Sequence, residues 1–154
     1  MVTLTVTMGV PGSGKTTWCE AQPGWLAGTD PARVNGRPWL ELNASLQAAA
    51  RRHLVDGVDV VTDGCNVHNQ LRRSWLELGR DVGARCVLAI LECDDDEALR
   101  RNAGRPVGQR VPPNKMTSYL RRFPTARMQA GAEGWDAITY PMPRTVVEGA
   151  TRAW

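Results

Sequence analysis

The sequence predicts a three-layer α/β fold in which helices flank a central parallel sheet. Apolar stretches of strand length alternate with longer stretches in which apolar residues recur at helical spacing. This alternation is typical of a parallel sheet with crossover helices. The length of 154 residues is close to the common size of one domain. We therefore expect a single domain over residues 1–154, with ligands at the carboxyl ends of the strands.

The first half of the chain is expected to contain the first three strands. Residues 3–8 are an apolar run of strand length, and turn residues follow them directly. The elements expected next are, in order, a helix at 15–21, a short strand at 25–27, a helix at 38–55 and a strand at 58–62.

The second half continues the same alternation. Residues 86–91 are the most apolar run and are expected to form an interior strand. Trp75 lies in the apolar stripe of a helix at 71–82 and is expected in the core, whereas Arg72 and Arg73 lie on exposed faces, where at least one should be solvated. The elements expected after residue 91 are helices at 97–102 and 114–123 and a strand at 136–140.

The composition is that of a globular protein without a membrane span. Hydrophobic residues make up 42% of the chain and charged residues 23%, and no apolar run approaches the roughly 18 residues of a membrane helix. The first strand leaves no room for a signal peptide. The four cysteines have no C-x-x-C spacing, so we expect reduced thiols. These features favour the cytoplasm of a bacterial or phage-infected cell; they leave the oligomeric state open.

The positive charge of the chain is almost entirely arginine. The formal net charge is +3, and Lys15 and Lys115 are the only lysines. Arginine binds phosphate through two parallel hydrogen bonds, which suits an anionic substrate. A genome rich in G and C would enrich arginine as well. The placement of particular arginines therefore has to decide between an anionic substrate and genome composition as the explanation.

Residues 9–17 match the pattern G-x-x-x-x-G-K-[S/T] of a phosphate-binding loop, the P-loop. Its glycines let the backbone turn tightly and aim N–H groups at phosphate oxygens, and the following helix adds its positive end. Lys15 is expected on the β- and γ-phosphates and the Thr16 hydroxyl on Mg²⁺. ATP or another nucleoside triphosphate, with Mg²⁺, is therefore the expected ligand of Gly9, Gly12, Ser13, Gly14, Lys15, Thr16 and Thr17.

Two aspartates stand at the ends of expected strands. Asp63 follows the strand at 58–62, where a carboxylate reaches Mg²⁺ directly or through water. Asp30 follows the second strand and can accept a proton from an acceptor hydroxyl, while Arg33 can hold an acceptor phosphate. Structural roles stay open for both aspartates, because Asp63 also fits a turn and Asp30, before a proline, also fits a helix N-cap.

Arginines gather at a helix end beside a Gly/Pro loop. They belong to the segment Arg100-Arg101-Asn102-Ala103-Gly104-Arg105, and a loop rich in Gly, Pro and Arg follows. This arrangement predicts a lid over about residues 100–113 that closes on the β- and γ-phosphates. We expect Arg100 to be a solvated bystander. At least one arginine of the doublet Arg121-Arg122 should be solvated too, and neither His53 nor His68 has a partner pattern for a metal or for catalysis.

Four motifs together resemble a known family. They are residues 9–18, residues 29–33, residues 62–66 with Arg72-Arg73, and residues 99–105. Their order and spacing over residues 3–125 resemble the kinase domain of phage-type 5′-hydroxyl polynucleotide kinases, which belong to the P-loop phosphotransferases. The resemblance implies a P-loop NTPase fold and ATP-dependent transfer of the γ-phosphate to the 5′-hydroxyl end of DNA or RNA.

The resemblance also implies residue roles. It places ATP and the metal on Lys15 and Thr16, and a further metal contact on Asp63. It makes Asp30 the general base and Arg33 the ligand of the phosphate beside the acceptor nucleoside, with Arg73 as another substrate contact. The two lid arginines of the family fall on Arg101 and Arg105.

Two other functions remain open on the sequence. A small-molecule kinase of the same superfamily, acting on a nucleoside, sugar or antibiotic hydroxyl, would share the P-loop. A nucleotide-switched binding module without turnover would share the fold. The first differs in its acceptor, and the second would form no ADP with any acceptor.

Overall fold

Five parallel strands form the central sheet in a computed structural model that describes residues 1–28, 39–141, 146–147 and 150–151. The order across the sheet is β2-β3-β1-β4-β5, so β1 lies in the middle and pairs with β3 and β4. The strands are β1 (Thr3–Met8), β2 (Trp25–Gly28), β3 (Val60–Asp63), β4 (Arg85–Ile90) and β5 (Ala137–Thr139). The predicted parallel α/β fold is confirmed.

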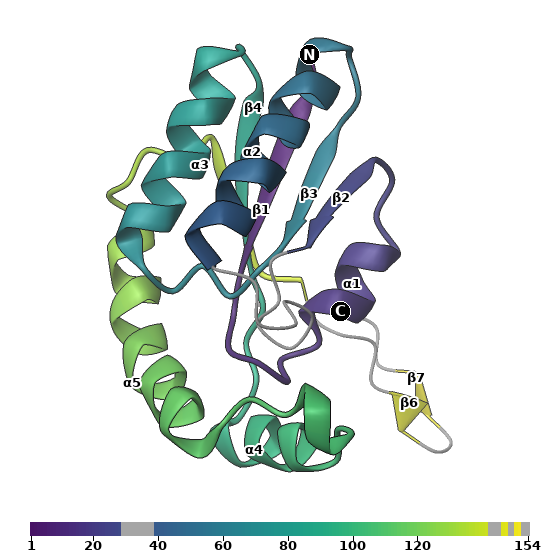
Figure 1. Cartoon of the computed structure of the whole chain (residues 1–154), viewed down its shortest axis with the longest axis vertical. Helices are drawn as coiled ribbons and strands as arrows, with labels where there is room; N and C mark the ends of the chain where they lie inside the picture. Colours follow the sequence, from purple (N-terminus) through teal and green to yellow (C-terminus); the bar gives the residue numbers. More distant parts are fainter. Residues whose placement is uncertain (29–38, 142–145, 148–149, 152–154) are drawn as a thin grey trace.

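Helices connect the strands and cover the sheet. Figure 1 shows α2 and α3 side by side across one face, with α5 beyond α3 and α4 below the carboxyl ends of the strands. The helices are α1 (Lys15–Glu20), α2 (Trp39–Val55), α3 (Asn69–Asp81), α4 (Asp95–Ala103) and α5 (Pro113–Ala130), with a 3-10 helix η2 (Val107–Gln109) and a small antiparallel pair β6 (Val146–Val147) and β7 (Ala150–Thr151).

The connection that follows β1 runs over one face of the sheet, and the connections that follow its neighbours β3 and β4 run over the other face. The thiol of Cys19 in α1 lies beside the side chain of Thr7 and donates to the carbonyl of Thr62 at 3.5 Å. Because Thr7 alternates along β1 with residues that pack against α3, α1 lies on the opposite face. The connections from β3 and β4 run over the α3 face instead. Oppositely directed connections open a crevice at the carboxyl end of β1, which is where ligands bind in open α/β sheets.

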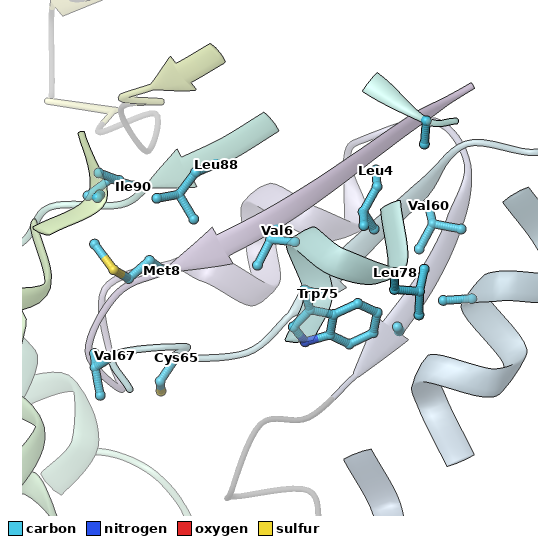
Figure 2. Packing of buried hydrophobic residues seen from close by; sticks show 14 of the residues in the cluster. Leu4, Val6, Met8, Val60, Cys65, Val67, Trp75, Leu78, Leu88 and Ile90 are labelled. Carbon is cyan, nitrogen blue, oxygen red and sulfur yellow. The ribbon is translucent and has the colours of Figure 1, made fainter. Parts of the chain in front are cut away.

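The main core lies between β1 and α3. Leu4, Val6 and Met8 alternate along β1 toward this face, and Trp75 packs against them with no exposed surface, as predicted for the core (Figure 2). Each such side chain contributes about 1.5–3 kcal/mol when it is buried. A second cluster joins the loop after β1 to α4 and α5 through Val10, Ala98, Val111 and Met116. The second cluster fixes the P-loop against the helices beneath it.

Helix α5 continues beyond its predicted C-terminal end. We expected a helix at 114–123, but α5 runs to Ala130 and contains Pro124. A proline inside a helix removes one hydrogen bond and costs about 3 kcal/mol. Ala126 and Ala130 are both buried in the main core, and this packing offsets the cost. Within the part of the chain described here, no helix is long and apolar enough to span a membrane.

Candidate active site

The P-loop has the tight backbone that its sequence predicts. Gly12 and Gly14 have φ angles of 86° and 91°, in the left-handed region that favours glycine. A Cβ on Gly12 would lie 2.7 Å from the carbonyl oxygen of Ala98, so α4 packs directly against the loop. The amide of Gly9 donates to the carbonyl of Cys65 at 3.0 Å. The loop is therefore held from below by α4 and from the side by the segment after β3.

Two buried polar side chains line the inside of the P-loop. Lys15 is almost fully buried, and its Nζ donates to the carbonyl of Val10 at 2.9 Å. Ser13 is completely buried and its Oγ has no hydrogen-bond partner among the described residues. Leaving a buried hydroxyl unpaired costs about 1–3 kcal/mol, which a phosphate oxygen bound in the loop would relieve. The residues present therefore fit a nucleotide phosphate.

Thr16 and Asp63, both expected beside Mg²⁺, are in direct hydrogen-bond contact. The Thr16 hydroxyl donates to Asp63 Oδ2 at 2.8 Å, and Asp63 is completely buried at the end of β3. Burial, reinforced by the negative charge of Asp63, raises the pKa of the neighbouring Cys19 thiol to about 12. A hydroxyl and a carboxylate are the hard oxygen ligands that Mg²⁺ prefers alongside substrate phosphates. The described residues contain no cluster of three or more His, Cys, Asp or Glu side chains that could hold a metal without such phosphates.

The arginines of α4 differ sharply from one another. Arg101 Nη1 donates to the carbonyl of Gly12 at 3.0 Å, so this side chain touches the P-loop. Arg105 has a buried Nη1 without a partner among the described residues. Arg100 is 73% exposed, and its ion-pair partner among the described residues is Glu97. The pKa of Glu97 is held below its ordinary range by the hydrogen bond from Arg100 and also by that from Arg101. Arg101 therefore contacts the P-loop, whereas Arg100 is exposed to solvent.

A side-chain clasp closes the loop that carries Arg105. Asn102 Nδ2 donates to the carbonyl of Val111, and the amide of Val111 donates back to Asn102 Oδ1, both at 2.9 Å. Arg110 Nε donates to the carbonyl of Arg105 at 2.7 Å within the same loop. Asn102 was not predicted as a functional residue. Its only sequence signal is its place between two arginines.

Arg72 contradicts its sequence interpretation. We expected an exposed helix face, but Arg72 is completely buried and forms an ion pair at 2.6 Å with Glu133 of the segment after α5. Its Nη1 also donates to the carbonyl of Asn66 at 3.0 Å. Asn66 has a φ of 45° and donates through Nδ2 to the carbonyl of Thr7 at 2.8 Å. Arg72 thus holds the turn between β3 and α3, whereas Arg73 is exposed as expected.

A cavity of about 690 Å³, lined by both apolar and polar side chains, opens beside this turn. It lies between the first half of α2, the start of α3 and the first half of α5, and Cys65 connects it to the P-loop through its bond to Gly9. Its polar lining includes Asn43, Gln47, Asn66, His68, Lys115 and Ser118. Sequence reasoning missed this cavity because its walls come from separate segments. The predicted acceptor residues Asp30 and Arg33 lie outside the described residues.

Fold and site together define a P-loop nucleotide-binding protein with the fold of P-loop kinases. The chain belongs to the AAA domain family (AAA_33), whose sequence profile matches residues 26–126. That match begins after the P-loop, so the motif and the geometry of residues 9–17 are independent support for nucleotide binding. No curated protein matches the chain.

Several solved structures share the fold at low sequence identity. A chain of the Pnkp1/Rnl/Hen1 RNA repair complex is 15% identical with a TM-score of 0.69, over 83% of this chain and 46% of that one. Kti12 from Chaetomium thermophilum in complex with ADP-AlF3 is 17% identical with a TM-score of 0.63, over 90% and 88%. A sugar kinase from Janibacter sp. HTCC2649 is 18% identical with a TM-score of 0.61, over 92% and 86%. The chain thus spans less than half of the repair-complex chain.

Proposed function

We propose that the protein is a Mg²⁺-dependent kinase that transfers the γ-phosphate of ATP to the 5′-hydroxyl end of DNA or RNA. The observation that carries the proposal is the convergence of Lys15, Arg101 and the Thr16–Asp63 pair on one P-loop. Phosphoryl transfer depends on positioning and on positive charge around the transferred group. The fold shared with a chain of an RNA repair complex supports a nucleic acid acceptor.

On the donor side, the P-loop amides, Ser13 and Lys15 bind the β- and γ-phosphates. A bound Mg²⁺ neutralises phosphate charge, and Thr16 and Asp63 are the residues that would hold it. Arg101 exchanges the carbonyl of Gly12 for a phosphate oxygen, and Arg105 Nη1, which has no partner among the described residues, gains one. Both guanidinium groups then offset the charge of the transition state.

On the acceptor side, the proposal uses the roles that the family resemblance assigns. Asp30 accepts the proton of the 5′-hydroxyl, and the hydroxyl oxygen forms a bond to the γ-phosphorus. At the same time the bond from the γ-phosphorus to the β–γ bridging oxygen breaks, which releases ADP. Arg33 binds the phosphate beside the acceptor nucleoside, and the exposed Arg73 contacts the substrate. These three assignments rest on the sequence motifs.

The decisive experiment measures transfer of labelled γ-phosphate from ATP in the presence of Mg²⁺. The acceptors are a 5′-hydroxyl oligonucleotide, 3′-nucleotides, free nucleosides and sugars. We expect label on the oligonucleotide and the 3′-nucleotides but not on the nucleosides. Label on small acceptors alone would refute the nucleic acid assignment, and ATP binding without ADP formation with any acceptor would refute kinase activity.

Variants of neighbouring arginines test the site itself. Arg101→Ala is expected to lower kcat by about 10²–10³-fold, the effect of removing one donor to a developing negative charge. Arg100→Ala is the matched control, because both side chains bind Glu97 but only Arg101 reaches the P-loop. Asp30→Ala is expected to abolish transfer and to leave ATP binding intact. Equal losses for the two arginine variants would contradict the assignment of Arg101.

The second candidate is a kinase of a small-molecule hydroxyl. The cavity of about 690 Å³ beside the P-loop has the volume of a small-ligand site, and the fold is shared with a sugar kinase. The same acceptor panel separates the two candidates.

A further inference from the structure

A second cavity adjoins the first and shares part of its wall. It has a volume of about 510 Å³ and lies between the start of α3 and α5, whose lining residues run from Asn114 to Gln129. Val67, His68 and Ser118 line both cavities, so the two are adjacent. We call the second one the outer cavity. Of the two cavities, the larger one is lined by Cys65, whose carbonyl accepts the amide of Gly9 in the P-loop, and Cys65 does not line the outer cavity.

The outer cavity is lined for an anion. Arg121 and Arg122 both contribute to its wall, beside hydroxyl and amide side chains, and neither it nor the larger cavity has an Asp or Glu among its described lining residues. Neither arginine forms a hydrogen bond or ion pair with another described residue. Arg127, farther along the same helix, is instead paired with Glu92 at 2.6 Å. The two outer-cavity arginines thus keep their donors available.

His68, which lines both cavities, lies within the electrostatic influence of nearby arginines. Burial, and then the charges of Arg122 and Arg72, hold the pKa of His68 below its ordinary range. The polar side chains Asn114, Thr117 and Thr125 add further hydrogen-bonding groups to the same wall. Guanidinium groups surrounded by hydroxyl and amide groups match the oxygens of a phosphodiester.

We propose that the outer cavity binds a backbone phosphate of a polynucleotide acceptor, farther along the strand than the nucleotide whose 5′-hydroxyl is phosphorylated, and that Arg121 and Arg122 are its cationic contacts. The proposal rests on the proposed kinase function for the direction of the strand. With the reacting end at the P-loop and the first nucleoside in the larger cavity, the strand continues past His68 into the outer cavity. Mononucleotides end before they reach it.

The test compares two arginine doublets on exposed helix faces. Arg121→Ala/Arg122→Ala removes the proposed contacts. Arg51→Ala/Arg52→Ala removes the same charge from α2 and is the control for net charge, with the added loss of the ion pair between Arg51 and Asp81 at 2.8 Å. Binding of a fluorescent single-stranded 5′-hydroxyl dodecamer is measured by anisotropy over a salt series. Transfer to the dodecamer and to a 3′-mononucleotide is measured alongside.

We expect the Arg121/Arg122 variant to bind the dodecamer at least tenfold more weakly than the unmodified protein. The slope of log affinity against log salt should fall by about 0.7, the value for one lost phosphate contact to a single strand. The tenfold loss of dodecamer affinity corresponds to about 1.4 kcal/mol. The kcat/KM of the variant for the 3′-mononucleotide should stay within about twofold, because one nucleotide does not reach the outer cavity. The control variant should keep both properties.

Unchanged dodecamer binding in the Arg121/Arg122 variant would overturn the proposal, as would an equal loss in the control or an equal loss with the mononucleotide. Failure of the kinase function is a different result, since the unmodified protein would then label no nucleic acid end. Binding is measured without turnover, so it tests the outer cavity in either case.

Discussion

Replacing Glu133 by glutamine removes the negative charge that compensates Arg72. Among the ion-paired cations of the described residues, Arg72 is the most deeply buried. Arg72 has no exposed side-chain surface, whereas Glu133 keeps 20% of its own. The Glu133→Gln substitution would preserve the shape and one acceptor but would leave the guanidinium charge uncompensated. Removing one partner of a buried pair costs about 3–5 kcal/mol, and the retained acceptor places the expected loss near 3 kcal/mol.

The partners should respond unequally. After Arg72→Met, the Glu133 carboxylate can still reach water, so we expect a loss of about 1–3 kcal/mol. Adding Arg72→Met to Glu133→Gln should recover part of the stability lost by Glu133→Gln alone, because no buried charge then remains.

The effect also depends on pH in a defined direction. Burial raises the pKa of Glu133, but the hydrogen bonds from Arg72 and Trp135 outweigh it, so the pKa lies below the ordinary value of 4.5. A lowered carboxylate pKa stabilises the fold above the unfolded-state pKa, and this stabilisation is lost as the pH falls through the folded-state pKa. The difference in the free energy of unfolding between the unmodified protein and the Glu133→Gln variant should therefore become smaller below about pH 4.5.

Urea unfolding at pH 7.5 and at pH 4 measures these differences, with the m-values as a check on two-state behaviour. A loss below about 1 kcal/mol for Glu133→Gln at pH 7.5 would refute the reasoning, given the range for a buried pair. A difference that is the same at both pH values would refute the role of its ionised carboxylate.

Three further predictions concern the P-loop and its surroundings. Gly12→Ala should lower the free energy of unfolding by more than about 1 kcal/mol and weaken ATP binding. The φ of 86° at Gly12 disfavours a side chain, and a Cβ there would lie 2.7 Å from the carbonyl oxygen of Ala98. Urea unfolding and nucleotide titration measure both effects, and a variant with unchanged stability and affinity would be contrary evidence. Asn102→Ala should lower kcat more than ATP affinity by releasing the clasp on Val111; an equal effect on both would exclude a role specific to the lid. Cys19, with a pKa of about 12, should resist thiol reagents at pH 8 until urea unfolds the protein, and fast labelling in buffer would contradict its burial.

Sequence patterns located the parts of the site that depend on local structure. The glycine spacing predicted the P-loop, and the aspartate at the end of a strand predicted the carboxylate beside Thr16, because parallel strands end at one edge of the sheet. The same patterns misplaced Arg72. Helical periodicity identifies an apolar face, but the partner that buries this arginine lies 61 residues away in the sequence.

Packing between distant segments explains the remaining differences. Pro124 is a local signal for the end of a helix, yet burial of Ala126 and Ala130 keeps α5 intact beyond it. The clasp between Asn102 and Val111 and both cavities likewise depend on how separate helices meet. Such features follow from tertiary contacts, which no local spacing in this chain reports.

The two cations at the P-loop already have hydrogen-bond partners within that loop. Lys15 holds the carbonyl of Val10, and Arg101 holds the carbonyl of Gly12. A phosphate that enters must therefore trade places with these carbonyls, so part of its electrostatic attraction is spent on displacing them. In return, the loop does not have to be assembled around the nucleotide. The protein thus exchanges some binding enthalpy for a lower ordering entropy, and calorimetry of nucleotide binding would register that exchange as a modest heat with a small entropic penalty.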